Sequence, residues 1–271
     1  MERGGPETRV PGEKRTGKMK PPGDGVHLVD VAPTVARVLG LEMEDPDGTA
    51  LEQVEDWGCS RAVILIVDAL GCGLYRLLRP GLCNLPRMAG QGLMFGAAPA
   101  SGHTTPAIAS ILTGLLPRSH GVYRTSDASR SGIKSVLEMA HEKGLRSAVV
   151  MEQQGAEAFQ GRIDIIRGVP GSLGPLEFDR RICRSSLEAL ALEPRILASH
   201  FTAIDRFCHS GPANMISPAA RAVDAHIGRI AGALRADTML IICGDHPPHA
   251  GPLRVDEGPV LLMLWRKDSS P

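Results

Sequence analysis

Short apolar runs alternate along this chain with longer segments in which apolar residues recur at helical spacing. The runs are rich in Val, Ile and Leu, which is typical of strands buried on both faces of a parallel sheet. They predict strands at 62–67, 93–98, 147–151, 164–167, 196–204, 238–243 and 259–265. Helical spacing predicts helices at 26–41, 75–92 with a break at Pro80, 105–116, 133–143, 180–192 and 218–234. This alternation favours an α/β three-layer sandwich, in which a mostly parallel central sheet carries helices on both faces.

Composition narrows the classes of protein that fit this pattern. The chain has 271 residues, of which 43% are hydrophobic and 22% charged, and its formal net charge is zero. This length suffices for one large α/β domain, which we expect to span 26–271. A neutral balance creates no global field that would attract nucleic acid or a membrane surface. We therefore expect a small molecule, rather than either of these, as the partner.

The first 25 residues differ from the rest, because they are rich in Gly, Pro and charge and have no apolar segment. We expect a disordered tail at 1–25 and no secretory signal. The chain contains no run of 18 apolar residues, so no transmembrane helix is predicted. Its six cysteines form no CxxC pair. Scattered cysteines of this kind are typical of reduced, buried thiols, and they predict a cytoplasmic protein.

Acidic residues and histidines end three of the predicted strands. Asp68 follows the first strand, Asp205 and His209 are expected in a loop after the run at 196–204, and Asp245 and His246 follow the run at 238–243. In open α/β sheets, ligands bind at the carboxyl ends of the strands. One such aspartate often only caps a helix. Three carboxylates and several imidazoles at one edge would repel one another without cations, so the set predicts a site for two metal ions.

Asp245 and His246 are adjacent, and adjacent residues of a strand point to opposite faces. They can therefore share a metal ion only if the chain turns at this point. Gly244 before the pair and Pro247–Pro248 after it favour such a turn. His249 adds a third imidazole to this segment.

A further motif, SGHTTPAIASILTG, places Thr104 and Thr105 at the start of a predicted helix, with Pro106 in its first turn. Backbone N–H groups and the positive end of the helix dipole favour an anion there. A hydroxyl at this position could act as a nucleophile if a metal ion lowered its pKa. The alternative is that a threonine only caps the helix. His103 is either a ligand or a loop residue.

Four segments, VILIVDALG, HTTPAIASILTGLLPRSHGV, HFTAIDRFCHSGP and LIICGDH, together resemble the alkaline phosphatase superfamily. The resemblance is strongest to its type I phosphodiesterase/nucleotide pyrophosphatase branch and to the related cofactor-independent phosphoglycerate mutases. It implies an alkaline phosphatase-like sandwich and a catalytic threonine at Thr104. It also implies that one metal ion is held by Asp68, Asp245, His246 and the Thr104 oxygen.

The second metal ion implied by the resemblance takes Asp205, His209 and one more histidine. His249 is the candidate for that position, and His27 is the fallback. A mixed set of carboxylates and imidazoles suits Zn²⁺ or Mn²⁺ better than Ca²⁺ or Mg²⁺, and Zn²⁺ is our first choice.

The order of one element departs from the family. A helix of the type DxxPTxxxxLG follows the last strand in the superfamily, whereas DVAPTVARVLGL stands here at 30–41, before the first strand. The segment 26–55 therefore resembles a permuted C-terminal element, whose helix would pack beside strand 259–265. The alternative is an unrelated N-terminal helix.

The activity expected from the resemblance is hydrolysis of a phosphomonoester or phosphodiester through a covalent phosphothreonine. Transfer of the mutase type is an alternative, although the large extra domain of the mutases has no counterpart here. A non-catalytic module that binds metal or phosphate is another. Substrate contacts stay open: the candidate cations are Arg118, Arg124, Arg130 and Lys134, each of which could instead be a surface residue, and the candidate aromatics are Tyr75 and Tyr123.

Overall fold

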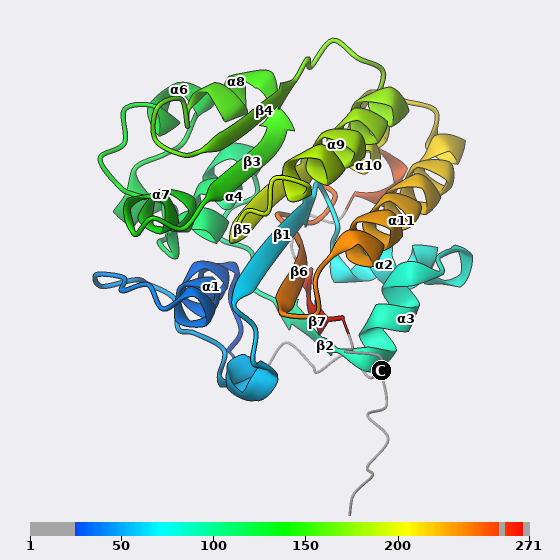
Figure 1. Cartoon of the computed structure of the whole chain (residues 1–271). Helices are drawn as coiled ribbons and strands as arrows, with labels where there is room; N and C mark the ends of the chain where they lie inside the picture. Colours follow the sequence, from blue (N-terminus) through cyan, green and yellow to red (C-terminus); the bar gives the residue numbers. More distant parts are fainter. Residues whose placement is uncertain (1–24, 255–257, 268–271) are drawn as a thin grey trace, which may run out of the picture.

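In a computed structural model that describes residues 25–254 and 258–267, seven strands form one sheet in the order β2-β7-β6-β1-β5-β3-β4 (Figure 1). All neighbouring pairs are parallel except those of β7, which runs antiparallel to both β6 and β2. The strands are β1 Arg61–Val67, β2 Leu93–Ala97, β3 Ser147–Glu152, β4 Ile165–Val169, β5 Ile196–Phe201, β6 Thr238–Gly244 and β7 Val260–Arg266. The predicted, mostly parallel α/β sheet is confirmed.

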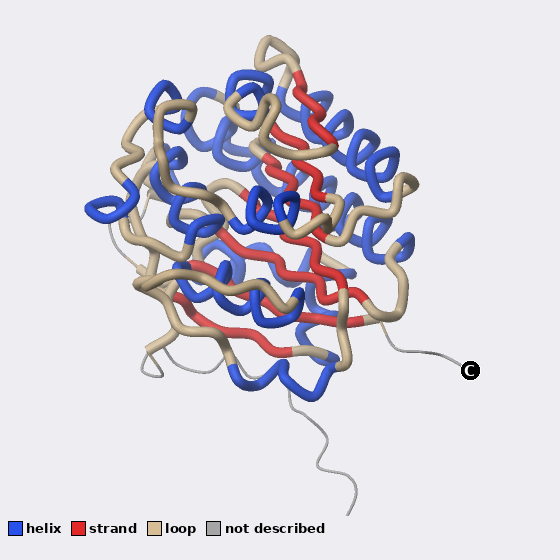
Figure 2. Tube along the Cα trace, turned by 60° about the vertical axis from the view of Figure 1, so that its left-hand side comes forward, coloured by secondary structure: helices blue, strands red, loops and turns tan. Residues whose placement is uncertain are grey.

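Helices cover both faces of the sheet, and Figure 2 shows the strands between them. One layer contains α2 Cys72–Leu78, α3 Asn84–Gln91, α9 Pro175–Leu190, α10 Ala203–Ser210 and α11 Ile216–Ala233. The other contains α1 Val31–Leu39, α4 Thr104–Thr113, α7 Val136–Glu142 and α8 Gln153–Glu157, with the short α5 Pro117–His120 and α6 Thr125–Ala128 nearby. Alternate residues of β1 enter the two cores, with Val63 in one and Ile64 in the other. This two-sided burial explains why the strands appear in the sequence as continuous apolar runs.

One predicted strand is too long. The run 196–204 divides into β5, which ends at Phe201, and α10, which begins at Ala203. Asp179 on α9 accepts hydrogen bonds from the backbone N–H groups of Thr202 and Ala203, at 2.8 and 3.1 Å. A carboxylate from another helix thus satisfies the first donors of α10 and favours its start at this point. Asp205 therefore lies on a helix and not in the expected loop.

The N-terminal element packs on the layer that contains α4. Its helix α1 contacts mainly β1, α4 and α7. The residues before α1 join the end of β2, where Leu28 N–H donates to the Ala98 carbonyl and Ala98 N–H to that of Val26, at 3.0 and 2.9 Å. The helix was expected beside β7. The strand that it mainly contacts is instead β1, which lies two strands from β7 in the sheet order. The permutation stays a prediction.

Further predictions concern the N-terminal tail, the cysteines and membrane-spanning helices. The tail was predicted at 1–25, and residues 1–24 of it lie outside the described part of the chain. All six cysteines are free. Across 25–254 and 258–267, every helix is too short or too polar to cross a lipid bilayer.

Candidate metal centre and active site

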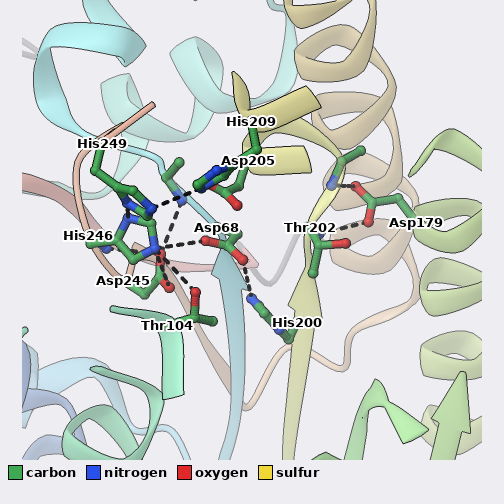
Figure 3. A network of polar contacts seen from close by, with 12 residues as sticks. Asp68, Thr104, Asp179, His200, Thr202, Asp205, His209, Asp245, His246 and His249 are labelled. Atoms are coloured by element: carbon green, nitrogen blue, oxygen red, sulfur yellow. Dashed lines mark hydrogen bonds and ion pairs between the residues drawn. The ribbon is translucent and has the colours of Figure 1, made fainter. Parts of the chain in front are cut away.

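The predicted acids and histidines meet at the carboxyl edge of three adjacent strands. Asp68 directly follows β1, Asp245 directly follows β6, and α10 brings Asp205 to the same edge immediately after β5. Figure 3 shows these carboxylates around the imidazoles of His246 and His249. The convergence follows from the parallel strands, whose carboxyl ends lie side by side.

His246 is at the centre of the first group. Its Nδ1 lies 2.9 Å from the Pro247 carbonyl oxygen and donates its proton there, so a neutral ring directs the Nε2 lone pair the other way. Nε2 lies 3.2 Å from Thr104 Oγ1, 3.1 Å from Asp68 Oδ1 and 3.5 Å from Asp245 Oδ2. A lone pair aimed at two carboxylates is unfavourable unless a proton or a cation lies between them. Burial opposes the charge of the imidazolium, but Asp68 and Asp245 raise the pKa of His246 to about 9.

The two carboxylates of this group are buried and incompletely satisfied. Asp245 Oδ1 accepts hydrogen bonds from the backbone N–H groups of Ala69 and His246, whereas Oδ2 accepts none from the described residues. Asp68 Oδ1 has the His246 ring, at 3.1 Å, as its polar neighbour. Burial, together with the charge of Asp68, raises the pKa of Asp245 to about 7. Burial would also raise the pKa of Asp68, but contacts with His200 and His246 hold it well below its usual range. Buried carboxylate oxygens without partners fit a divalent cation.

The backbone around these residues is shaped to aim them at one point. Ala69 has a positive φ of 62°, which is unusual for a residue with a side chain, and its N–H holds Asp245. Gly244 ends β6 where the chain passes the carbonyl group of Leu70, and a methyl carbon there would lie 2.8 Å from the Leu70 carbonyl carbon. The turn predicted after Gly244 is therefore present, and it lets both Asp245 and His246 face the cluster.

A second group adjoins the first. His209 Nε2 lies 2.8 Å from His249 Nε2 and 3.5 Å from Asp205 Oδ1, an oxygen that accepts no hydrogen bond from the described residues. His249 Nδ1 lies 3.3 Å from His246 Nδ1, which joins the two groups. Burial and the charge of Asp68 raise the pKa of Asp205 to about 6.

Ligand atoms in each of two sets lie within 4.8 Å of one another: Asp68, Asp245 and His246 form one set, and Asp205, His246 and His249 the other. Of the two histidines considered for the last position, His249 thus lies in the cluster. His27 caps its own turn, where Nδ1 accepts a hydrogen bond from Val29 N–H.

Thr104 lies at the start of α4, beside the first group. His103, and not Thr104, occupies the N-cap position of α4, with an extended backbone and no side-chain capping bond. Thr104 is the first helical residue, and its hydroxyl contacts His246 instead of capping the helix. The His103 ring lies 6.3 Å, centre to centre, from that of His249. The alternative of a capping threonine therefore does not describe Thr104.

Sequence reasoning missed His200. It lies near the carboxyl end of β5, 5% exposed, with Nε2 at 3.4 Å from Asp68 Oδ2. Burial lowers the pKa of its imidazole, but the contact with Asp68 raises this pKa by more than burial lowers it. The net shift of the His200 pKa is therefore upward. The signal was available, because a histidine inside an apolar run at the end of a strand needs a polar partner.

A cavity of about 330 Å³ opens beside Asp68 and Thr104. Its walls come from α4, α6, β3, α8, α9, β5 and α10, together with the loop after β4. The cations that the sequence suggested, Arg118, Arg124, Arg130 and Lys134, are not among its described lining residues, whereas Arg206 is. Neither candidate tyrosine is among the described lining residues, since Tyr75 is buried in the core and Tyr123 is 58% exposed; Phe178 is among them.

Comparison with known proteins shows which structures share this fold. The model of the Sulfatase family matches residues 60–166. The structure is similar to phosphonoacetate hydrolase from Sinorhizobium meliloti (TM-score 0.59, 13% identity, 76% of this chain and 60% of that chain). It is also similar to a putative sulfatase from Bacteroides thetaiotaomicron (0.59, 13%, 77% and 64%). A further similarity is to a protein of the alkaline phosphatase superfamily from Vibrio parahaemolyticus (0.59, 16%, 89% and 68%). The chain has the fold of the alkaline phosphatase superfamily.

The matched lengths and identities decide what these similarities show about the chain. The present chain spans 60% of the length of the phosphonoacetate hydrolase that it matches, and the identities speak for the fold alone. Comparison with curated proteins found no match. The Sulfatase segment includes Asp68 and Thr104, whereas Asp205, Asp245 and the histidines of the cluster lie beyond it. In this superfamily fold, the grouping of those later residues therefore rests on the geometry described above.

Proposed function

We propose that the chain is a two-metal hydrolase of phosphate esters in which Thr104 is the nucleophile. The observation that carries the proposal is the position of Thr104 Oγ1, 3.2 Å from His246 Nε2, which in turn contacts two buried carboxylates. A hydroxyl at a helix N-terminus beside such a cluster is suited to attack an anionic ester. The similarity in fold to a phosphonoacetate hydrolase and to a putative sulfatase supports the reaction class.

The residues present fit two divalent cations. Asp68, Asp245, His246 and the Thr104 oxygen would hold one, and Asp205, His209 and His249 would hold the other. The mixed oxygen and nitrogen donors favour Zn²⁺, with Mn²⁺ as the alternative. Bound ions would supply a lower pKa for the hydroxyl and for water, and would offset charge on the phosphoryl oxygens.

The protein's own groups define two displacement steps. Thr104 Oγ1 attacks phosphorus and loses its proton to water, the bond from phosphorus to the ester oxygen breaks, and the departing oxygen keeps the electron pair and takes a proton from water. Water then attacks the phosphothreonine, the bond from phosphorus to Oγ1 breaks, and phosphate leaves while Thr104 regains its hydrogen. The N-terminus of α4 orients the phosphoryl oxygens in both steps.

Two alternatives make different predictions. Sulfate esters are favoured as a second substrate class by the Sulfatase match over 60–166. A transfer reaction of the mutase type needs a means of holding the acceptor, whereas 122–199 here contain the elements of this one domain from α6 to β5. We therefore propose water as the acceptor and a small ester as the substrate. We also propose the cytoplasm as the location, in keeping with the free thiols.

The test combines metal analysis with turnover of 4-nitrophenyl phosphate, bis(4-nitrophenyl) phosphate, 4-nitrophenyl sulfate and phosphonoacetate. We expect about two equivalents of bound metal per chain and hydrolysis of a phosphate ester. Thr104→Ala should abolish turnover and leave most metal bound, whereas Thr113→Val, on the same helix, should leave both unchanged. Less than one equivalent of metal, with no turnover in added Zn²⁺ or Mn²⁺, would refute the proposal. Conversion of 3-phosphoglycerate to the 2-phospho isomer without free phosphate would instead support a mutase.

A further inference from the structure

Arg206 is the arginine among the described lining residues of the 330 Å³ cavity. Its Nη2 donates to the carbonyl oxygens of Gly171 and Leu173, at 3.2 and 2.8 Å, and the guanidinium carbon lies 5.5 Å from the centre of the Phe178 ring. These contacts fix the plane of the guanidinium on the cavity wall. Its other N–H groups remain to be satisfied by water or by a ligand.

Arg206 has a charge that the surrounding protein does not offset. No carboxylate of the described residues forms an ion pair with it, whereas Arg184, for example, pairs with Glu188. The lining acids of the cavity are Asp68, which belongs to the metal-type cluster, and Glu152, which caps α8 through the Gln154 N–H. A half-buried guanidinium that is held in place without a carboxylate partner is suited to bidentate binding of an anion.

The position of Arg206 separates it from the reacting end of the cavity. Asp205 and Arg206 are consecutive on α10, so their side chains diverge by about 100°. Asp205 joins His209 in the cluster, whereas Arg206 reaches the loop that follows β4. Thr104 contacts His246 after β6, and β6 and β4 are four strands apart in the sheet order, at about 4.8 Å a strand. The hydroxyl and the guanidinium therefore lie toward opposite ends of the cavity.

We propose that Arg206 binds a second anionic group, a carboxylate or a phosphate, on the leaving part of the substrate. This inference rests on the proposed function for the reacting end. A cavity of about 330 Å³ is at the small end of ligand sites, which run from about 300 to 1,000 Å³. The substrate class is thus a small phosphoester that carries negative charge at both ends, rather than a nucleotide or a polymer.

The kinetic test is a two-by-two comparison. One member of the substrate pair is carboxyphenyl phosphate, as the meta and para isomers, and the other is the matching carbamoylphenyl phosphate, which is equal in shape but neutral at that end. We expect the native enzyme to prefer the better carboxylate isomer by about 10- to 100-fold in kcat/KM. Arg206→Gln should remove that preference and leave kcat/KM for the carboxamide within about threefold. Arg206→Lys should keep part of it.

The control is Arg184→Gln, which removes the same charge from the exposed face of α9 and should leave both substrates unchanged. A native preference that survives in Arg206→Gln, or no native preference in either isomer, would overturn the inference. An equal loss for carboxylate and carboxamide would also overturn it, because Arg206 would then act on the fold or on the reacting phosphoryl group. Circular dichroism of each variant detects loss of folding, and Arg206→Lys supplies the comparison if Arg206→Gln does not fold.

A binding measurement separates this inference from the proposed function. Calorimetric titration with carboxybenzyl and carbamoylbenzyl phosphonates needs no turnover, and we expect the carboxylate to bind about tenfold more tightly only when Arg206 is present. If no ester is hydrolysed but this difference persists, the proposed function fails and the anion site stands. If esters are hydrolysed and the difference is absent, the reverse holds. A phosphonate that bears a second phosphate in place of the carboxylate decides which anion is preferred.

Discussion

Replacement of Gly244 by alanine tests the description of the turn that aims Asp245. A methyl carbon at Gly244 would lie 2.8 Å from the carbonyl carbon of Leu70, against a comfortable separation of about 3.5–4.0 Å. The partner atoms are backbone in the strained turn at Ala69, so they cannot rotate away as a flexible side chain could. We expect Gly244→Ala to destabilise the fold by about 1–3 kcal/mol, the usual cost of overpacking.

The same substitution should affect the site, because relief of the clash moves either Asp245 or the turn that holds it. A displacement near 1 Å at a catalytic group can lower the rate by about 100-fold. Urea denaturation measures the stability, and metal titration with phosphoester turnover measures the site.

The matched control is Gly73→Ala on the exposed face of α2, where an added methyl would meet no atom within 4 Å. Alanine is a better helix former than glycine, so this variant should be more stable by about 0.5–1 kcal/mol. The two substitutions therefore have opposite expected signs. If Gly244→Ala were as stable as the native protein and bound metal equally well, the close approach of Leu70 to β6 would be wrong.

Three further predictions follow from other contacts. Asp224 on α11 accepts hydrogen bonds from three N–H groups at the start of α3, at 2.7–3.1 Å, so Asp224→Ala should cost about 2–4 kcal/mol in urea unfolding without loss of metal. Asp179→Ala removes the cap of α10, so we expect a loss of about 1–2 kcal/mol and weaker metal binding at Asp205, measured by titration; unchanged affinity would contradict the role of the cap. Removal of metal with EDTA should lower the melting temperature, because an ion present at a thousand times its Kd adds about 4 kcal/mol to stability. Asp245→Asn should reduce that difference, and equal melting temperatures with and without EDTA would argue against a bound ion.

Much of the fold could be predicted because its signals are local. The strands were visible as apolar runs since each is buried between two helical layers, and Gly40, which ends α1 with a φ of 66°, was recognisable as a helix terminator. Strand direction was harder to predict. An apolar run has the same composition whether its neighbours are parallel or antiparallel, so the antiparallel β7 was not distinguished from the rest.

The candidate site divides in the same way. Asp68, Thr104 and the pair Asp245–His246 stand next to clear ends of strands or helices, so their sequence positions already implied a common edge of the sheet. The start of α10 was not predictable from its own residues, because the carboxylate that caps it belongs to Asp179 on another helix. The sequence therefore extended β5 too far and placed Asp205 in a loop.

His200 and Arg206 show most clearly what the sequence leaves to the tertiary structure. Both lie within the quoted segment HFTAIDRFCHSGP, but their places in that segment do not reveal which distant residues they contact. Their significance comes from contacts with Asp68, Gly171 and Leu173, which are distant in sequence. Residue order sets which side chains stand at the ends of elements, since hydrophobic periodicity is local. Only the packing of helices α9 and α10 against the sheet selects which of them share a cavity, because that depends on atoms brought together from the whole chain.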